Sequence, residues 1–349
     1  MRDRGAILVM TLWVLALLSL LAFAMVARAR GAVRDADHAA TERRCRELLA
    51  TLAQMSLARL AYDENASFDA FREEWGQGLQ LDGSAALDGF GDLGLDESDF
   101  ALSVAAADEC AKIGVNEAPP ALLAQALREI GAPESIAEAI VDWRDADTLG
   151  AAEGDAYAEY APPNKPLEHI EKLLFVQGVT PEIFFGEDGN HNGALDPEED
   201  DESLLLPRDN GDGRLQVGLM DLFTVYGDGT INLNTCSLPV LRTLLAYAAP
   251  AFNADAVAQT LVERRCGPDA CEGTGDDHPF ESAADIEEAL GEELFQACDA
   301  AGIKLEVVSG AFRFYLRVTI PSENIRREAD MLVLRDGETL RVAAWHDGQ

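Results

Sequence analysis

An apolar run near the N-terminus constrains what this chain can become. No charged residue occurs from Ala6 to Ala27, where only Thr11 and Ser19 are polar. As a helix rising about 1.5 Å per residue, the run is about 33 Å long, enough to cross the hydrocarbon core of a bilayer. A secretory signal has a shorter apolar core of roughly 7–15 residues, which ends in a small-residue cleavage site. The run therefore predicts a retained single-pass membrane helix over residues 6–27.

The charge balance bears on what the rest of the chain can bind. Among 349 residues, 63 are acidic and 27 are basic, for a formal net charge of −36. Nucleic-acid affinity depends on Lys and Arg that displace counterions from phosphates, so nucleic acid is excluded as an expected partner. An acidic surface of this kind suits divalent cations or solubility.

Helical character continues beyond the apolar run. Neither Pro nor Gly occurs from Ala32 to Asn65, and Cys45, Leu48, Leu52 and Met55 recur at a spacing of three to four. The pattern predicts one helix over residues 6–65, with a membrane half and a half that packs on a soluble body. A Gly- and Asp-rich loop follows, and "FALSVAAA" (100–107) reads as a strand.

The stretch 111–302 reads as helical and contains an internal repeat. "IGVNEAPPALLAQALREIG", from Ile113, corresponds to "TINLNTCSLPVLRTLLAYA", from Thr230, so that Asn116 matches Asn234. "AEAIVDWRD" (137–145) likewise corresponds to "AQTLVERRC" (258–266). We expect two helical units of roughly 60 residues with short Pro/Gly turns.

The C-terminal stretch changes to a period of two. "KLEVVSGAFRFYLRVTI" (304–320) alternates, and "READMLVLRDGETLRVAAW" (327–345) reads as two strands around the Asp336-Gly337 turn. The sequence therefore predicts an α+β fold in which a large α-helical domain of two repeats is inserted.

The acidic segment between the repeats matches a twelve-residue calcium loop, D-x-[DN]-x-[DN]-G-x5-E. "DGNHNGALDPEE" (188–199) places oxygen donors and the sharp-turn glycine Gly193 at the defined positions. Such a loop can supply the six to eight oxygens that calcium needs, because it coils around the ion. The alternative is a solvated acidic turn. The candidate ligands are Asp188, Asn190, Asn192, Ala194 through its carbonyl, Asp196 and Glu199.

A second, degenerate loop follows at "RDNGDGRLQVGLMD" (208–221). Asp209 and Asp212 could contribute, but Arg208 stands at the first position and Leu219 at the twelfth. Calcium is thus the expected cofactor, with one ion predicted and a second left open. Neither loop has clear EF-hand helices around it, which favours a structural ion over a conformational switch.

No motif of an active site was found. The five histidines are scattered, and no Gly-x-Ser-x-Gly, His-Glu-x-x-His or phosphate loop occurs. In "DWRDAD" (142–147), Asp142 and Asp145 with Arg144 are better explained as a helix-end network than as an acid/base pair, and Trp143 as a core aromatic. "CGPDAC" (266–271) is compatible with a small disulfide loop between Cys266 and Cys271 outside the cytoplasm, although the sequence does not fix how the cysteines pair. We expect a non-enzymatic protein.

The N-terminus resembles that of type IV pilins: a short charged leader ending in Gly, and then a long apolar helix. The resemblance implies that prepilin peptidase removes residues 1–5 after Gly5 and that Ala6 becomes the methylated N-terminus. Pilins usually have Glu at the fifth mature position, which compensates a neighbour's N-terminal ammonium; here Met10 stands there. A subunit without this glutamate is suited to the topmost place in a fibre.

Motifs in the body resemble the minor pseudopilin family GspK of type II secretion. They are "LWVLALLS" (12–19), "VNEAPPALL" (115–123), "DWRDAD" (142–147), "FTVYG" (223–227), "INLNT" (231–235) and Trp345. The resemblance implies a pilin fold interrupted by a helical domain, calcium binding, and a tip complex with the minor pseudopilins GspI and GspJ alongside other pseudopilins. It also implies a Gram-negative host, with an inner-membrane anchor and a periplasmic body. The protein would then initiate and cap the pseudopilus during export of folded proteins.

The expected domains follow from these assignments. They are a leader (1–5), an N-terminal helix (6–65), a first part of the pilin domain (66–110), an inserted helical domain (111–302) with calcium loops at 186–221, and a second pilin part (303–349). One alternative is a membrane-anchored periplasmic helix-hairpin-helix binding protein, which the acidic charge disfavours. The other is an anchored periplasmic enzyme, which would need converging polar groups.

Overall fold

The computed structural model describes residues 3–62, 67–82, 100–146, 162–188, 208–209, 211, 213, 215–227, 229–321 and 325–348. The chain divides into two units, Met1–Leu52 and Ala53–Gln349. Each unit is described by itself.

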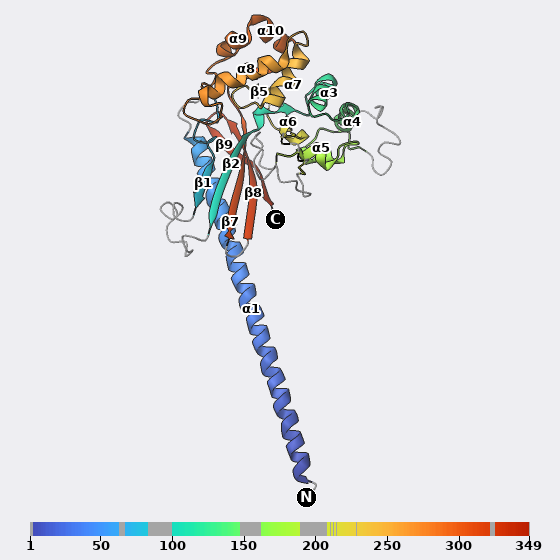
Figure 1. Ribbon diagram of the computed structural model, residues 1–349, viewed down its shortest axis with the longest axis vertical. Coiled ribbons are helices and arrows are strands. Elements are labelled where there is room, and N and C mark those ends of the chain that lie inside the picture. Colours follow the sequence, from blue (N-terminus) through green and yellow to red (C-terminus); the bar gives the residue numbers. More distant parts are fainter. Residues whose placement is uncertain are drawn as a thin grey trace. The chain divides into compact units, whose positions relative to one another are not determined.

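The N-terminal helix α1 extends over Asp3–Ala61 (Figure 1). It ends four residues before the predicted boundary, and Arg59 in its last turn donates to the carbonyl of Gly78 (2.7 Å). From Met10 onward α1 contains a window with a mean hydropathy of 2.4, none of which is buried. By length and composition, this helix could cross a membrane.

A five-stranded antiparallel sheet has the order β1-β2-β7-β8-β9 (Figure 1). One face is apolar, because alternate residues of β7 point to it, including Phe312, Phe314 and Leu316. The opposite face carries Arg313 and Arg317 in alternation. The strands are β1 (Leu79–Asp82), β2 (Ala101–Asp108), β7 (Ala311–Ile320), β8 (Ile325–Asp336) and β9 (Thr339–Gly348).

The predicted C-terminal hairpin is confirmed. Strands β8 and β9 pair from Asp336↔Thr339 onward, and Gly337 occupies the turn with φ +59°. A residue with positive φ is what a tight hairpin turn requires, and glycine adopts it without strain. A register shift lies between Leu332 and Val333.

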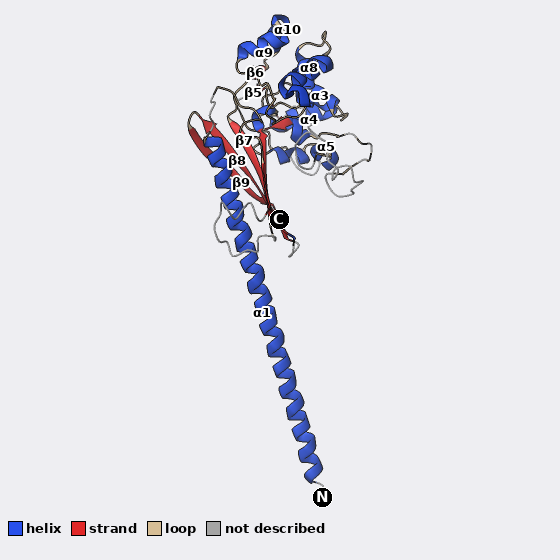
Figure 2. Cartoon of the chain, turned by 60° about the vertical axis from the view of Figure 1, so that its left-hand side comes forward, coloured by secondary structure: helices blue, strands red, loops and turns tan. Residues whose placement is uncertain are grey.

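The residues between β2 and β7 form a helical region. It lies beyond the end of the sheet at which β2 ends and β7 begins (Figures 1 and 2). This arrangement confirms the predicted α+β class with a helical insertion. Its helices are η1 (Glu109–Ala111), α3 (Pro120–Glu129), α4 (Ser135–Arg144), η3 (Ile170–Phe175), α5 (Pro181–Phe185), α6 (Leu219–Leu222), α7 (Leu238–Ala248), α8 (Ala254–Cys266), η4 (Gly267–Asp269), α9 (Ala283–Leu290) and α10 (Glu292–Ala300).

Four short strands in this region were not anticipated by the sequence pattern. Strand β3 (Ile113–Gly114) pairs in parallel with β4 (Phe223–Thr224), and β5 (Thr230–Asn232) pairs in parallel with β6 (Lys304–Glu306). Each pair joins the beginning of one repeat to its end. The repeats are therefore longer than the expected 60 residues. Strands of two or three residues are too short to show a period of two.

The repeats share one apolar core. Helices α3 and α7, which correspond in the repeat, bury equivalent leucines, including Leu123 and Leu127 on α3 and Leu241 and Leu245 on α7. Trp143 also lies in this core and is 6% exposed, so its predicted role as a core aromatic is confirmed.

Candidate functional site: the acidic segment and the polar junction

The two ends of the acidic segment lie side by side and are joined by hydrogen bonds. This pair of hydrogen-bonded ends is the tied base of the segment. Gly186 and Val217 form an isolated antiparallel bridge. The Glu187 backbone N–H donates to the Gln216 carbonyl (2.7 Å), while the Gln216 N–H donates to the Glu187 carboxylate (3.0 Å). Helix α5 precedes this base and α6 follows it, with only five and four residues. Neither is long enough to be an EF-hand helix, in agreement with the sequence.

Two of the candidate calcium ligands can be placed. Asp188 is the first residue beyond the tied base and is only 2% exposed. Asp209 accepts a hydrogen bond from the Gly211 N–H (2.7 Å). Within the described residues, no group of three or more His, Cys, Asp or Glu side chains could hold a metal. The other candidates lie outside the described residues: Asn190, Asn192, Ala194, Asp196, Glu199 and Asp212.

The described residues fit a calcium ion in two respects. Asp188 is buried at the first ligand position of the loop, where its carboxylate supplies the oxygen type that calcium prefers. In the second loop, Gly213 has a φ of +68°, a positive value that suits the sharp-turn glycine of a calcium loop.

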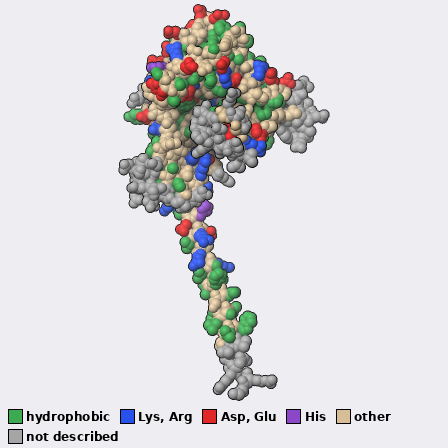
Figure 3. Space-filling view, in the orientation of Figure 1, with side chains coloured by type: hydrophobic (Ala, Val, Ile, Leu, Met, Phe, Trp, Pro, Cys, Tyr) green, Lys and Arg blue, Asp and Glu red, His purple; other side chains and the backbone are tan. Residues whose placement is uncertain are grey.

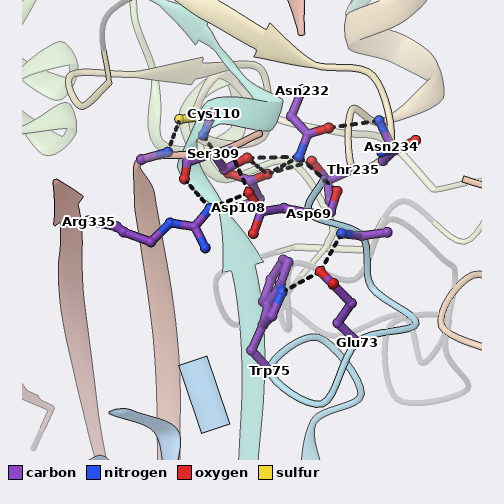
Figure 4. Close-up of polar contacts among 12 residues, drawn as sticks. Asp69, Glu73, Trp75, Asp108, Cys110, Asn232, Asn234, Thr235, Ser309 and Arg335 are labelled. Carbon is purple, nitrogen blue, oxygen red and sulfur yellow. Dashed lines mark hydrogen bonds and ion pairs between the residues drawn. The ribbon is translucent and has the colours of Figure 1, made fainter. Parts of the chain in front are cut away.

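A buried polar junction joins the helical region to the sheet (Figure 4). Asp108, the last residue of β2, accepts hydrogen bonds from Thr235 Oγ1 (2.6 Å) and Asn232 Nδ2 (3.1 Å), and also from the Ser309 hydroxyl. Its other oxygen accepts from the Cys110 N–H (2.8 Å). The carboxylate therefore connects β2 with the second repeat and with the segment that leads into β7.

Asp69 extends this junction to the segment that follows α1. Its carboxylate accepts from the Ser309 N–H (2.6 Å) and pairs with Arg335 of β8, which also donates to the Ser309 carbonyl (2.7 Å). Asn232 Nδ2 donates to the Asp69 carbonyl (3.0 Å). Five separate stretches of chain thus converge on two carboxylates.

Burial raises the pKa of Asp108 to about 6, against the lowering effect of the Ser309 and Thr235 hydroxyls. The neighbouring Asp69 carboxylate raises it further. Because water is excluded and two acids share the site, the junction favours a protonated Asp108 under mildly acidic conditions.

A second buried network stands beside the first, around Glu109. Arg313 of β7 pairs with Glu109 and with Asp330 of β8 (2.6 Å), and the Thr224 hydroxyl donates to Glu109. Burial acts to raise the pKa of Glu109, but Lys112 and Arg313 outweigh it, so the pKa lies below its usual range. This ion pair fixes η1 and β4 onto the sheet.

The two repeats carry an arginine at the same place, and both arginines donate to backbone carbonyls. Arg144 at the end of α4 donates to the carbonyls of Val115 and Ala118. Arg265, at the corresponding place in α8, donates to the Leu233 carbonyl (2.6 Å). The "DWRDAD" motif therefore belongs to a helix-end network, which supports the structural interpretation over an acid/base role.

The expected Cys266–Cys271 disulfide is not formed. Both residues have free thiols, with Cys266 buried and Cys271 exposed. Gly267 between them turns away with φ +67° and packs against the Asp276 backbone, and the Cys271 N–H is bonded to Asp269 (2.9 Å). The turn is held by backbone and carboxylate contacts instead of a sulfur bridge.

The three N-terminal residues with predicted roles lie in α1. Gly5 and Ala6 fall within its first turns. Met10 is 72% exposed, with apolar neighbours along the helix. The sequence did not indicate the polar junction. Its members are separated by up to 266 positions, and only the polar residues of "INLNT" gave a sign of it.

Comparison with known proteins adds a family to this geometry. Residues 102–185 match the family model of type II secretion system (T2SS), protein K. No curated protein sequence matches the chain significantly. The fold resembles that of a chain in the crystal structure of the GspK-GspI-GspJ complex from the enterotoxigenic Escherichia coli type 2 secretion system, with a TM-score of 0.53 and 15% identity. The match covers 86% of this chain and 94% of the other.

Proposed function

We propose that this chain, which carries the type II secretion system protein K domain at residues 102–185, is the minor pseudopilin at the tip of a type II secretion pseudopilus. One observation supports this most strongly. An apolar helix of membrane-spanning length and an antiparallel sheet occur together with a helical region inserted between two adjacent strands. The matched chain of the GspK-GspI-GspJ complex shares this fold over 86% of the present chain.

The protein acts by assembly, without catalysis. Prepilin peptidase removes residues 1–5 and leaves Ala6 as the methylated N-terminus. The apolar part of α1 first anchors the chain in the inner membrane, with the body in the periplasm, and later packs against helices of neighbouring subunits. GspI and GspJ are the partners that the matched complex suggests.

Met10 determines the place of the subunit in the fibre. A neutral side chain there cannot compensate the N-terminal ammonium of a subunit stacked above it, and an uncompensated charge in apolar surroundings is costly. The helical region adds bulk that blocks further addition. The protein therefore caps the pseudopilus and helps to initiate it.

Calcium stabilises the acidic segment. Asp188, Asn190, Asn192, the Ala194 carbonyl, Asp196 and Glu199 would hold one ion, and Asp209 and Asp212 are candidates for a second. A bound ion supplies positive charge that neutralises a strongly acidic excursion. The buried Asp188 beside the tied base supports this assignment.

The first test is the intact mass of the protein purified from its own membrane. Loss of Met1–Gly5 with a methylated Ala6 is expected, together with co-purification of GspI and GspJ. An uncut N-terminus in cells that contain the peptidase would overturn pilin-type processing. Introducing Met10→Glu separates charge from bulk: an unchanged tip position would show that the helical region, and not Met10, enforces capping.

A further inference from the structure

Three arginines stand directly after the apolar part of α1. Arg28, Arg30 and Arg34 are exposed, and they lie within about 9 Å of one another along the helix axis. No acidic residue occurs between Asp3 and Asp35. In Figure 3, Lys and Arg side chains follow the apolar side chains along the helix. The apolar stretch therefore offers these guanidinium groups no counter-charge, and the nearest carboxylates, Asp35 and Asp37, lie on the side away from it.

The arginines lie on two sides of the helix. At about 100° per residue, Arg30 and Arg34 are roughly 40° apart on one side, and Arg28 lies roughly 160° from Arg30 and 120° from Arg34, on the other side. A single protein partner would contact one side of the helix. A layer of lipid headgroups surrounds it on all sides, and fits this distribution better.

Charge complementarity also points to an anionic layer. From Tyr62 to the C-terminus the chain has 58 acidic and 18 basic residues, so this part is repelled by a negatively charged surface. Residues 1–61 have nine basic and five acidic residues, which reverses the balance. Arg28, Arg30 and Arg34 therefore lie where attraction to anionic lipid can offset that repulsion.

We propose that Arg28, Arg30 and Arg34 bind the phosphate groups of anionic phospholipids in the leaflet where α1 leaves the membrane. This inference depends on the proposed membrane span but not on a secretion role. The arginines hold the end of the apolar stretch at the headgroup level.

The test uses the full chain reconstituted in phosphatidylcholine vesicles that contain spin-labelled phosphatidylglycerol or spin-labelled phosphatidylcholine. Electron paramagnetic resonance measures the preference of the protein-associated lipid shell for the anionic label. About a fivefold preference per bound arginine is the upper expectation at low salt, and it should fall as salt rises. The variant Arg28→Gln/Arg30→Gln/Arg34→Gln should lower the preference to near one.

A matched control lies on the same helix. Arg43→Gln/Arg44→Gln/Arg46→Gln removes the same charge, but its first site is about 14 Å beyond Arg34. The two variants are compared at about 0.15 M salt, where the Debye length of about 8 Å is shorter than this separation. This control should keep the wild-type preference. Equal loss in both variants, or no preference in the wild-type protein, would overturn the proposal. Leader removal and co-purification of GspI and GspJ, measured on the same preparations, test the proposed function separately.

Discussion

The side-chain amide of Asn234 clamps both backbone groups of Phe280, since it accepts from the Phe280 N–H (2.7 Å) and donates to the Phe280 carbonyl (2.9 Å). Asn116 makes the same pair of bonds to Leu167, at 2.8 and 3.0 Å. Each clamp ties the strand that begins a repeat to the segment after its second helix. The two sequence repeats therefore share the same pattern of hydrogen bonds.

Removing the clamp should destabilise the helical region. Asn234→Ala leaves two buried backbone groups unpaired and should lower the free energy of unfolding by about 3 kcal/mol, whereas Asn116→Ala, which is half-buried, should cost about 2 kcal/mol. Denaturant unfolding of the full chain in detergent measures both. The helix cap Asn253→Ala, a control, should cost about 1 kcal/mol. If Asn234→Ala costs no more than this control, the clamp does not stabilise the repeat.

Asp108 should make stability depend on pH. Its folded pKa of about 6 exceeds the ordinary 3.8, so the folded protein binds the proton more tightly than the unfolded chain. The contribution of Asp108 to the free energy of unfolding should therefore fall as pH rises from about 4 to about 6, by on the order of 3 kcal/mol, and then stay level. Asp108→Asn should abolish this fall, while the exposed Asp299→Asn should retain it. Parallel pH curves for wild type and Asp108→Asn would contradict the assignment.

The ion pair of Arg313 with Glu109 should contribute far more to the free energy of unfolding than the ion pair of Arg317 on the same strand. Arg313→Met leaves a buried carboxylate without its partner and should cost about 3–5 kcal/mol. Arg317→Met removes a pair with Glu328 in which both side chains are about 40% exposed, and should cost less than about 1 kcal/mol. Thermal unfolding of the two variants side by side makes the comparison, and similar losses would refute it.

The hydrogen-bonded ends of the acidic segment should determine its affinity for calcium. In Gly186→Ala the new Cβ would lie 2.4 Å from the Gln216 carbonyl oxygen, at a φ of +63°, so the tied base must open. We expect the calcium-induced rise in Tm to shrink by half or more. Gly131→Ala is the control, because Gly131 lies outside the acidic segment and has a similar φ of +68° with open space around it, so that it introduces backbone strain alone.

Two results would argue against this prediction. A calcium-induced rise that is unchanged in Gly186→Ala would show that the base does not position Asp188. If calcium does not raise the Tm of the wild-type protein, the proposal of a calcium site is wrong.

The sequence predicted those structural features that depend only on residues close to one another along the chain. The Asp336-Gly337 turn, the strand after Phe100 and the apolar run each depend on neighbouring residues, and the structure contains all three. The repeat was visible because a duplicated pattern needs no knowledge of contacts.

The polar junction could not be predicted in this way. Asp69 and Arg335 are 266 positions apart, and neither lies in a motif that marks it as buried. A carboxylate at the end of β2 could equally have faced solvent. Asp108 is buried because the chain returns to the same end of the sheet at Ser309 and because Asn232 and Thr235 of the second repeat contact its carboxylate.

Strands β2 and β7 are antiparallel neighbours, with Asp108 opposite Phe312. Topologically they are the two arms of a β-hairpin, and the whole helical region is its loop. The cost of closing a loop grows only slowly with its length, so the register of the sheet does not depend on what fills this one. The same small sheet can therefore carry an insertion of almost any size between these two strands.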